Sequence, residues 1–121
     1  MKHNTLIALY HNPRCSKSRE ALNLLREQGV EPEVILYLET PPNAKTLKSL
    51  LAQLGISARA LLRKSEDAYK ELGLADQTLS ETALINAMVE HPKLIERPIA
   101  IKDGKAVIGR PPENVLQLLT P

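Results

Sequence analysis

Two short apolar runs separated by an amphipathic stretch constrain the fold most strongly. The first run, Thr5–Tyr10, is partly β-branched and stops at the turn-forming His11-Asn12-Pro13, which is typical of a buried strand. Apolar residues then recur at helical spacing from Cys15 to Gln28, and Gly29 supplies a C-terminal stop. Because Glu33–Leu38 is again an apolar run, the sequence predicts a β-α-β unit whose two strands are parallel.

The remaining chain first changes to helical patterns and then returns to strands. Pro41-Pro42 ends the β-α-β unit, and polar capping residues precede several of the following apolar stripes. The predicted helices are Asn43–Leu54, Ala58–Lys64, Glu66–Leu72 and Glu81–Glu90, the first, second and last of them capped by Asn43, Ser57 and Ser80. The predicted hairpin pairs Ile99–Ile101 with Ala106–Ile108 around Asp103-Gly104, and a last helix covers Glu113–Leu119.

This order of elements predicts one α/β domain over residues 1–121. β-α-β, a helical segment and then β-β-α is the order of a thioredoxin-like mixed β-sheet with an inserted helical segment, here at about 43–91. The net charge is only +2 and its signs are interspersed, so nothing indicates nucleic-acid binding. No apolar run approaches the ~18 residues of a membrane span, and the first four residues lack a signal-peptide pattern. We therefore expect a cytoplasmic protein that binds neither nucleic acid nor membrane.

Cys15 is the only cysteine, and it stands where the first strand gives way to a helix. Backbone N–H groups at such a junction stabilise a thiolate, although position alone suits a small buried core residue equally well. Ser18 completes a Cys-x-x-Ser pattern, and His11 precedes the cysteine closely enough to contribute a proton or a positive charge. A phosphatase-type Cys-x5-Arg loop is disfavoured, because Arg19 falls at the fourth position. A lone cysteine also means that redox chemistry must borrow its second thiol.

The segment Tyr10–Arg19, with the sequence YHNPRCSKSR, resembles the active-site segment of glutaredoxin-dependent bacterial arsenate reductases. The resemblance extends in family order through almost the whole chain. Its other motifs are Leu36–Pro41, Arg59–Lys64, Glu71–Ala75, His91-Pro92, Arg97–Ile99 and Arg110-Pro111.

This resemblance implies an oxidoreductase that reduces arsenate to arsenite, with Cys15 attacking the oxyanion. It implies that His11 helps to activate the thiol and that Pro98 is a cis-proline. The implied ligands of the oxyanion are Arg63, Arg97, Arg110, Ser18 and Asn12. No bound cofactor or metal is implied; glutathione serves as co-substrate, and glutaredoxin resolves the adduct.

Two other functions are compatible with the same fold. Spx-type regulators bind RNA polymerase, but they commonly carry a second cysteine where this chain has Ser18. A monothiol glutaredoxin-like transferase would use Cys15 without needing three arginines. Arg14 and Lys17 add positive charge around Cys15 where some members of the reductase family have small or neutral residues, which leaves the physiological substrate open.

Overall fold

A computed structural model describes residues 6–119, and it consists of two compact units. The first unit contains the chain up to Thr40 and the chain from Arg97 onwards. The second unit is Pro41–Glu96, somewhat longer than the predicted insert of about 43–91. The start of the first predicted strand, at Thr5, lies outside the described residues.

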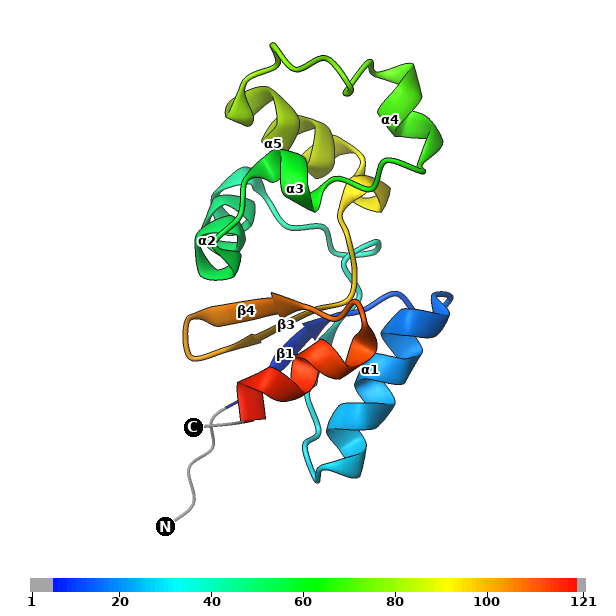
Figure 1. The fold of residues 1–121 in the computed structure, drawn as a ribbon, viewed down its shortest axis with the longest axis vertical. Coiled ribbons are helices and arrows are strands. Elements are labelled where there is room, and N and C mark those ends of the chain that lie inside the picture. The colour runs from blue at the N-terminus through cyan, green and yellow to red at the C-terminus, as the bar shows by residue number, and fades with distance from the viewer. Residues whose placement is uncertain (1–5, 120–121) are drawn as a thin grey trace. The chain divides into compact units, whose positions relative to one another are not determined.

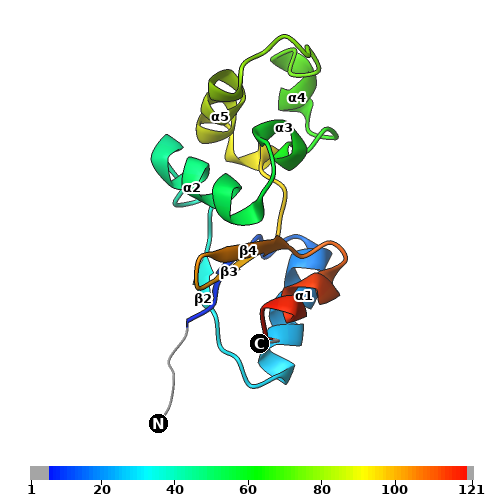
Figure 2. The same cartoon turned by 60° about the vertical axis from the view of Figure 1, so that its left-hand side comes forward.

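The first unit is built on a four-stranded sheet in the order β2-β1-β3-β4. Figure 2 labels β2, β3 and β4 of this sheet. Strand β1 (Ala8–Tyr10) pairs in parallel with β2 (Glu33–Ile35) and antiparallel with β3 (Ile99–Lys102). Strand β4 (Lys105–Ile108) pairs antiparallel with β3 at the sheet edge. The predicted mixed sheet, with its β-α-β and β-β halves, is therefore confirmed.

One face of this sheet is covered by two helices, α1 (Ser16–Glu27) and the C-terminal 3₁₀ helix η2 (Pro112–Leu119), which lie side by side (Figure 1). Burial on α1 recurs at helical spacing, so one stripe of the helix faces the core. The buried side chains of this core are Ile7, Leu9, Ala21, Leu22, Leu25, Ala100, Val115 and Leu118. The last predicted helix is thus present, but it is 3₁₀ and begins at Pro112.

The second strand is shorter than predicted. After Leu36 the chain forms a turn at residues 37–39, and the Leu36 carbonyl accepts hydrogen bonds from the backbone N–H groups of Glu39 and Thr40, each at 2.9 Å. The prediction of a strand through Leu38 is wrong because the partner strand β1 already ends at Tyr10. The apolar character of the segment instead reflects the burial of Tyr37, whose ring centroid lies 6.3 Å from that of Tyr10.

The hairpin between β3 and β4 turns at the two predicted residues. Asp103 and Gly104 both have positive φ, 52° and 77°. A two-residue type I′ turn needs positive φ at both central residues, and its twist matches that of the two strands it joins. At the other end of the hairpin, Ile99 pairs with Ile108, and Gly109 continues the ladder by donating its N–H to the Pro98 carbonyl at 2.8 Å.

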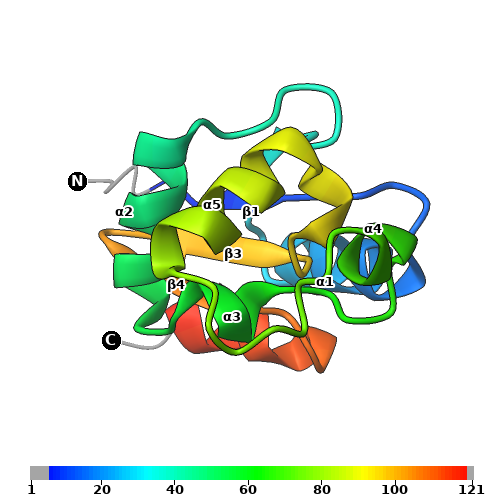
Figure 3. The same ribbon diagram turned by 90° about the horizontal axis from the view of Figure 1, so that it is seen from above.

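The second unit is helical. Its helices are α2 (Ala44–Leu54), α3 (Ala58–Leu61), α4 (Asp67–Glu71), α5 (Glu81–Glu90) and the short 3₁₀ helix η1 (Pro92–Leu94). Helix α5 packs against both α2 and α3 (Figure 3). The side chains of Asn43, Ser57 and Ser80 accept hydrogen bonds from backbone N–H groups three residues on, which confirms all three predicted caps.

Helix α3 is shorter than the predicted Ala58–Lys64. Leu62 adopts an extended conformation and forms a β-bridge with Ile95, while Arg63 donates its backbone N–H to the Leu94 carbonyl at 2.8 Å. The backbone N–H of Arg63 thus pairs with residue 94, whereas in a longer helix it would pair with a carbonyl within α3. Pairing with a distant segment therefore overrides the local helical pattern.

We predict that Gly109→Ala destabilises the protein. A Cβ atom at this position would stand 2.8 Å from Cγ of Pro98 and 3.0 Å from Cγ1 of Val115, both of which are buried. Overpacking of this kind costs about 1–3 kcal/mol, more than the gain of up to about 1 kcal/mol from a less flexible unfolded chain. The free energy of unfolding in urea should fall accordingly, whereas the exposed Ser65→Ala should leave it nearly unchanged. Equal stability of the two variants would contradict the packing argument.

Candidate active site

Cys15 is the residue at which the loop after β1 becomes helix α1. It is the N-cap of α1, with extended backbone angles, and its N–H donates to the Asn12 carbonyl at 3.0 Å. The side chain of Asn12 stabilises the same turn, because its Oδ1 accepts a hydrogen bond from the N–H of Arg14 at 3.0 Å. The thiol is partly exposed, so a reagent can reach it.

The surroundings of Cys15 favour its thiolate. Partial burial raises the pKa of the thiol, but the backbone N–H of Ser18, the positive charge of Arg97 and the backbone N–H of Lys17 all lower it. A side-chain hydrogen bond from Arg97 lowers the pKa further, and the net result lies below the ordinary value of a thiol. The prediction that the start of a helix activates this cysteine therefore has a structural basis, to which Arg97 adds a full charge.

Two arginines flank the β3–β4 hairpin at the end of the sheet where β1 stops and the chain continues to Cys15. Arg97 precedes β3 and is buried, with 9 % of its surface exposed, whereas Arg110 follows β4 and is exposed. Nη1 of Arg110 donates to the backbone carbonyl of Arg97 at 3.4 Å, which links the two residues. The strand register places both arginines at the same end of the sheet, because Ile99 pairs with Tyr10 on one side and with Ile108 on the other. Both Arg97-Pro98 and Arg110-Pro111 are cis peptide bonds, which confirms the cis-proline that the resemblance implies at Pro98.

Ser18 is a buried residue in the first turn of α1, close to the turn that precedes Cys15. Its side chain is fully buried, and its Oγ lies 2.7 Å from Nδ1 of His11 and accepts a hydrogen bond from the backbone N–H of Asn12 at 3.0 Å. The hydroxyl thus already has hydrogen-bond partners within the protein, and the expectation that Ser18 binds the oxyanion stays a prediction. In the structure, Ser18 contributes its backbone N–H to Cys15 and its hydroxyl to His11.

His11 acts as a neutral imidazole rather than as a cation. Burial lowers its pKa first, and the positive charges of Arg26 and Arg19 lower it further. Because Ser18 is fully buried, its hydroxyl hydrogen needs an acceptor, and Nδ1 of His11 provides one when the ring proton is on Nε2. These effects disfavour the charged form of His11, and the expectation that it contributes a proton or a positive charge to the thiol stays a prediction. Sequence spacing did not reveal the influence of Arg26, which becomes apparent only from the folded chain.

Arg63 belongs to the second unit, where two carboxylates hold it. Its Nη1 lies 2.8 Å from Oε2 of Glu66, and its Nε lies 3.8 Å from Oε1 of Glu96. All three side chains are mostly buried, with exposed fractions between 18 and 26 %. The i,i+3 spacing of Arg63 and Glu66 is a signal that sequence reasoning overlooked.

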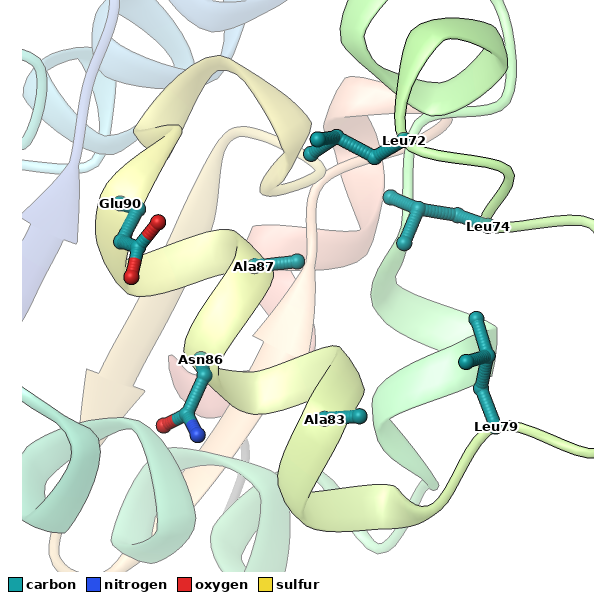
Figure 4. A pocket seen from close by; sticks show the side chains of 7 residues that line it. All are labelled: Leu72, Leu74, Leu79, Ala83, Asn86, Ala87 and Glu90. Atoms are coloured by element: carbon teal, nitrogen blue, oxygen red, sulfur yellow. The ribbon is translucent and has the colours of Figure 1, made fainter.

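A shallow pocket of about 270 Å³ lies in the second unit, and its lining residues include neither a cysteine nor an arginine (Figure 4). Leucines of the 72–79 segment face alanines of α5 across it, with Asn86 and Glu90 on the same helix. Arg59 anchors this segment by donating to the carbonyls of Leu74 and Asp76, each at 2.8 Å. Arg59 thus has a structural role, and Glu90 is the charged side chain among the residues that line the pocket.

Residues 6–119 contain no cluster of three or more His, Cys, Asp or Glu side chains that could hold a metal ion. Within the same residues, no helix is both long and apolar enough to cross a membrane.

Comparison with known proteins points to a single family. The profile of the ArsC family matches residues 10–118. The uncharacterized protein YfgD of Escherichia coli K12 is 67% identical over 114 residues, which cover 93% of this chain and 96% of that protein. A protein of Neisseria meningitidis named arsenate reductase is 51% identical, covering 93% of this chain and 97% of its own length. The solved structure titled arsenate reductase from Vibrio cholerae superposes with a TM-score of 0.92 at 56% identity, covering 94% and 98% of the two chains.

We predict that the thiol of Cys15 reacts with iodoacetamide with a pH midpoint below that of an ordinary thiol. Because Arg97 lowers the pKa through its charge and a hydrogen bond, Arg97→Gln should shift the midpoint upwards. Arg97→Lys keeps the charge and should give an intermediate midpoint, while Lys45→Gln, a charge loss in the second unit, should match wild type. An unshifted midpoint in Arg97→Gln would show that the backbone N–H groups alone activate the thiol.

Proposed function

The chain belongs to the ArsC family, and from this premise we propose that it is an oxidoreductase that reduces arsenate to arsenite with Cys15 as the nucleophile. The observation that carries the proposal is the contact of the Cys15 thiol with Arg97 at the start of α1, where the pKa of the thiol is lowered. Relatives named arsenate reductase cover nearly the whole chain, which favours neither a polymerase-binding regulator nor a glutathionyl transferase.

The first step joins Cys15 to arsenic. The thiolate attacks the arsenic atom of arsenate, an S–As bond forms, and one oxygen leaves as water after it takes up protons. The main obstacle is electrostatic, because a thiolate and an oxyanion at about 4 Å repel by about 4 kcal/mol at an effective dielectric near 20. Lowering the thiol pKa removes little of this barrier, since a more acidic thiol is also a weaker nucleophile.

Arginines oppose this repulsion directly. Arg97 already contacts the thiol, and Arg110 is linked to the Arg97 backbone, so both cations stand where negative charge accumulates. The planar guanidinium fork also matches a tetrahedral oxyanion in geometry. Asn12 and Arg63 are further ligands on the strength of the family resemblance alone.

Release of arsenite needs two electrons, and one cysteine cannot supply them in a closed cycle. Glutathione adds to the arsenic of the adduct and displaces a second oxygen as water. A thiol of glutaredoxin then takes the glutathione sulfur as a mixed disulfide, and the electron pair of that S–As bond remains on arsenic as As(III). Water cleaves the remaining bond to Cys15 and frees arsenite and the thiol. Reduced glutathione is maintained in the cytoplasm, which we propose as the compartment.

His11 and Ser18 are positioning residues in this scheme. The buried pair joins the turn before Cys15 to the first turn of α1, and Ser18 directs its N–H to the sulfur. His11 therefore activates the thiol indirectly, by holding the residue whose amide stabilises the thiolate.

We predict that purified protein supports arsenate-dependent NADPH oxidation when coupled to glutathione, glutaredoxin and glutathione reductase. Cys15→Ser should abolish the activity, and Arg97→Ala or Arg110→Ala should lower kcat/KM about 100-fold, as expected when a charge-stabilising donor is lost. Lys45→Ala, a charge loss on an exposed face of α2, serves as the control. If wild type and Cys15→Ser gave the same rate, the proposed function would fall.

We also predict that Glu66→Gln lowers the KM for arsenate about threefold. If Arg63 binds the oxyanion, the anion competes with the Glu66 carboxylate that now lies 2.8 Å from Nη1. Removing that charge while keeping the side-chain shape should favour the substrate. Glu71→Gln, on the exposed surface of α4, is the matched control. An unchanged KM in Glu66→Gln would remove Arg63 from the set of ligands.

A further inference from the structure

Exposed cations surround Cys15 on its own segment of chain. Arg14, Lys17 and Arg19 are all exposed, and no residue from His11 to Arg19 is acidic. Arg19 is engaged, because its Nη1 donates to the Pro13 carbonyl at 2.8 Å. Within residues 6–119, neither the guanidinium of Arg14 nor the ammonium of Lys17 has a hydrogen-bond or ion-pair partner. Two exposed cations that lie within two residues of Cys15 in the sequence are therefore available to an external anion.

The backbone sets where these two cations stand. Arg14 directly precedes Cys15, and the hydrogen bond from its N–H to Asn12 holds it in the tight turn. Lys17 is the second residue of α1, and helical side chains lean toward the N-terminus, so its ammonium leans toward the same turn. Arg14 and Lys17 thus stand on either side of Cys15 along the chain.

These charges exceed what the oxyanion itself requires. Arg97 contacts the thiol, Arg110 is linked to Arg97, and two backbone N–H groups already face the sulfur. The reaction has a second anionic reactant, however, since the chain has no other cysteine and its electron donor must arrive from solution. Glutathione carries two carboxylates besides its thiol, and exposed cations raise the rate at which such a reagent meets its target.

We infer that Arg14 and Lys17 bind the carboxylates of glutathione as it approaches Cys15, and so determine which thiol resolves the adduct. This inference rests on the proposed function for its biological meaning, but the binding preference itself can be measured without arsenate. Because Cys15 is the only thiol, its exchange with added disulfides reports on this site alone. In that exchange the thiolate forms a new S–S bond with one half of the disulfide, and the other half leaves as a thiolate.

The test compares oxidised glutathione, which carries four carboxylates, with the uncharged 2-hydroxyethyl disulfide. The ratio of the two second-order rate constants cancels any change in the pKa of Cys15. The double variant Arg14→Gln/Lys17→Gln should lower this ratio about fivefold, as expected for two exposed charge pairs. The control Lys45→Gln/Lys48→Gln loses the same charge from the exposed surface of α2 and should keep the wild-type ratio. Added salt should lower the ratio in wild type and in the control, and much less in the double variant.

Three results would overturn the inference: a ratio in the double variant equal to that of wild type, an equal fall in the control, or a salt dependence that the substitutions leave intact. The single variants Arg14→Gln and Lys17→Gln should each give part of the effect, which guards against misfolding of the double variant. In the arsenate assay, the double variant should raise the KM for glutathione and leave the KM for arsenate within twofold. If wild type failed to reduce arsenate but kept the preference for oxidised glutathione, the proposed function would fail and this inference would stand.

Discussion

A thiol and a guanidinium that are far apart in the sequence meet at one edge of a small sheet, and the site is organised around that contact. Cys15 follows β1 and Arg97 precedes β3, so the antiparallel pairing of Tyr10 with Ile99 brings them to the same edge. Taking Arg97 out of water is costly unless an anion compensates for it. An ionised Cys15 provides such compensation, which is the physical reason why Arg97 lowers the pKa of the thiol. The same contact therefore stabilises a buried cation and prepares a nucleophile.

Different residues of the site supply positive charge and hold the start of helix α1 in position. Arg97 and Arg110 carry the charge, whereas His11 and Ser18 form a buried neutral pair that fixes the start of α1. Burial keeps His11 neutral, and nearby Arg26 reinforces this effect. The positive charge that lowers the pKa of the thiol thus comes from Arg97 and not from His11.

The sequence correctly predicted the ends of those helices and strands that single capping or turn residues determine. The cap of Asn43 and the turn at Asp103-Gly104 follow from side-chain and backbone preferences that act within a few residues. The errors arose where distant segments decide the outcome. The strand stops before Leu36 because β1 has ended, and α3 stops at Leu61 because the next residues pair with η1 and its flank. The role of Ser18 depended on burial, which a Cys-x-x-Ser pattern does not reveal.

The two ends of the β3–β4 hairpin differ in how much change they can absorb. Arg97 and Arg110 flank the end where Ile99 faces Ile108, whereas the Asp103-Gly104 turn closes the opposite end. An insertion at the turn lengthens a surface loop and leaves the pairing of the strands intact. An insertion within either strand shifts its register by one residue and turns its side chains to the opposite face. Length variation among homologues, or a peptide tag introduced by an experimenter, is therefore best accommodated at the turn.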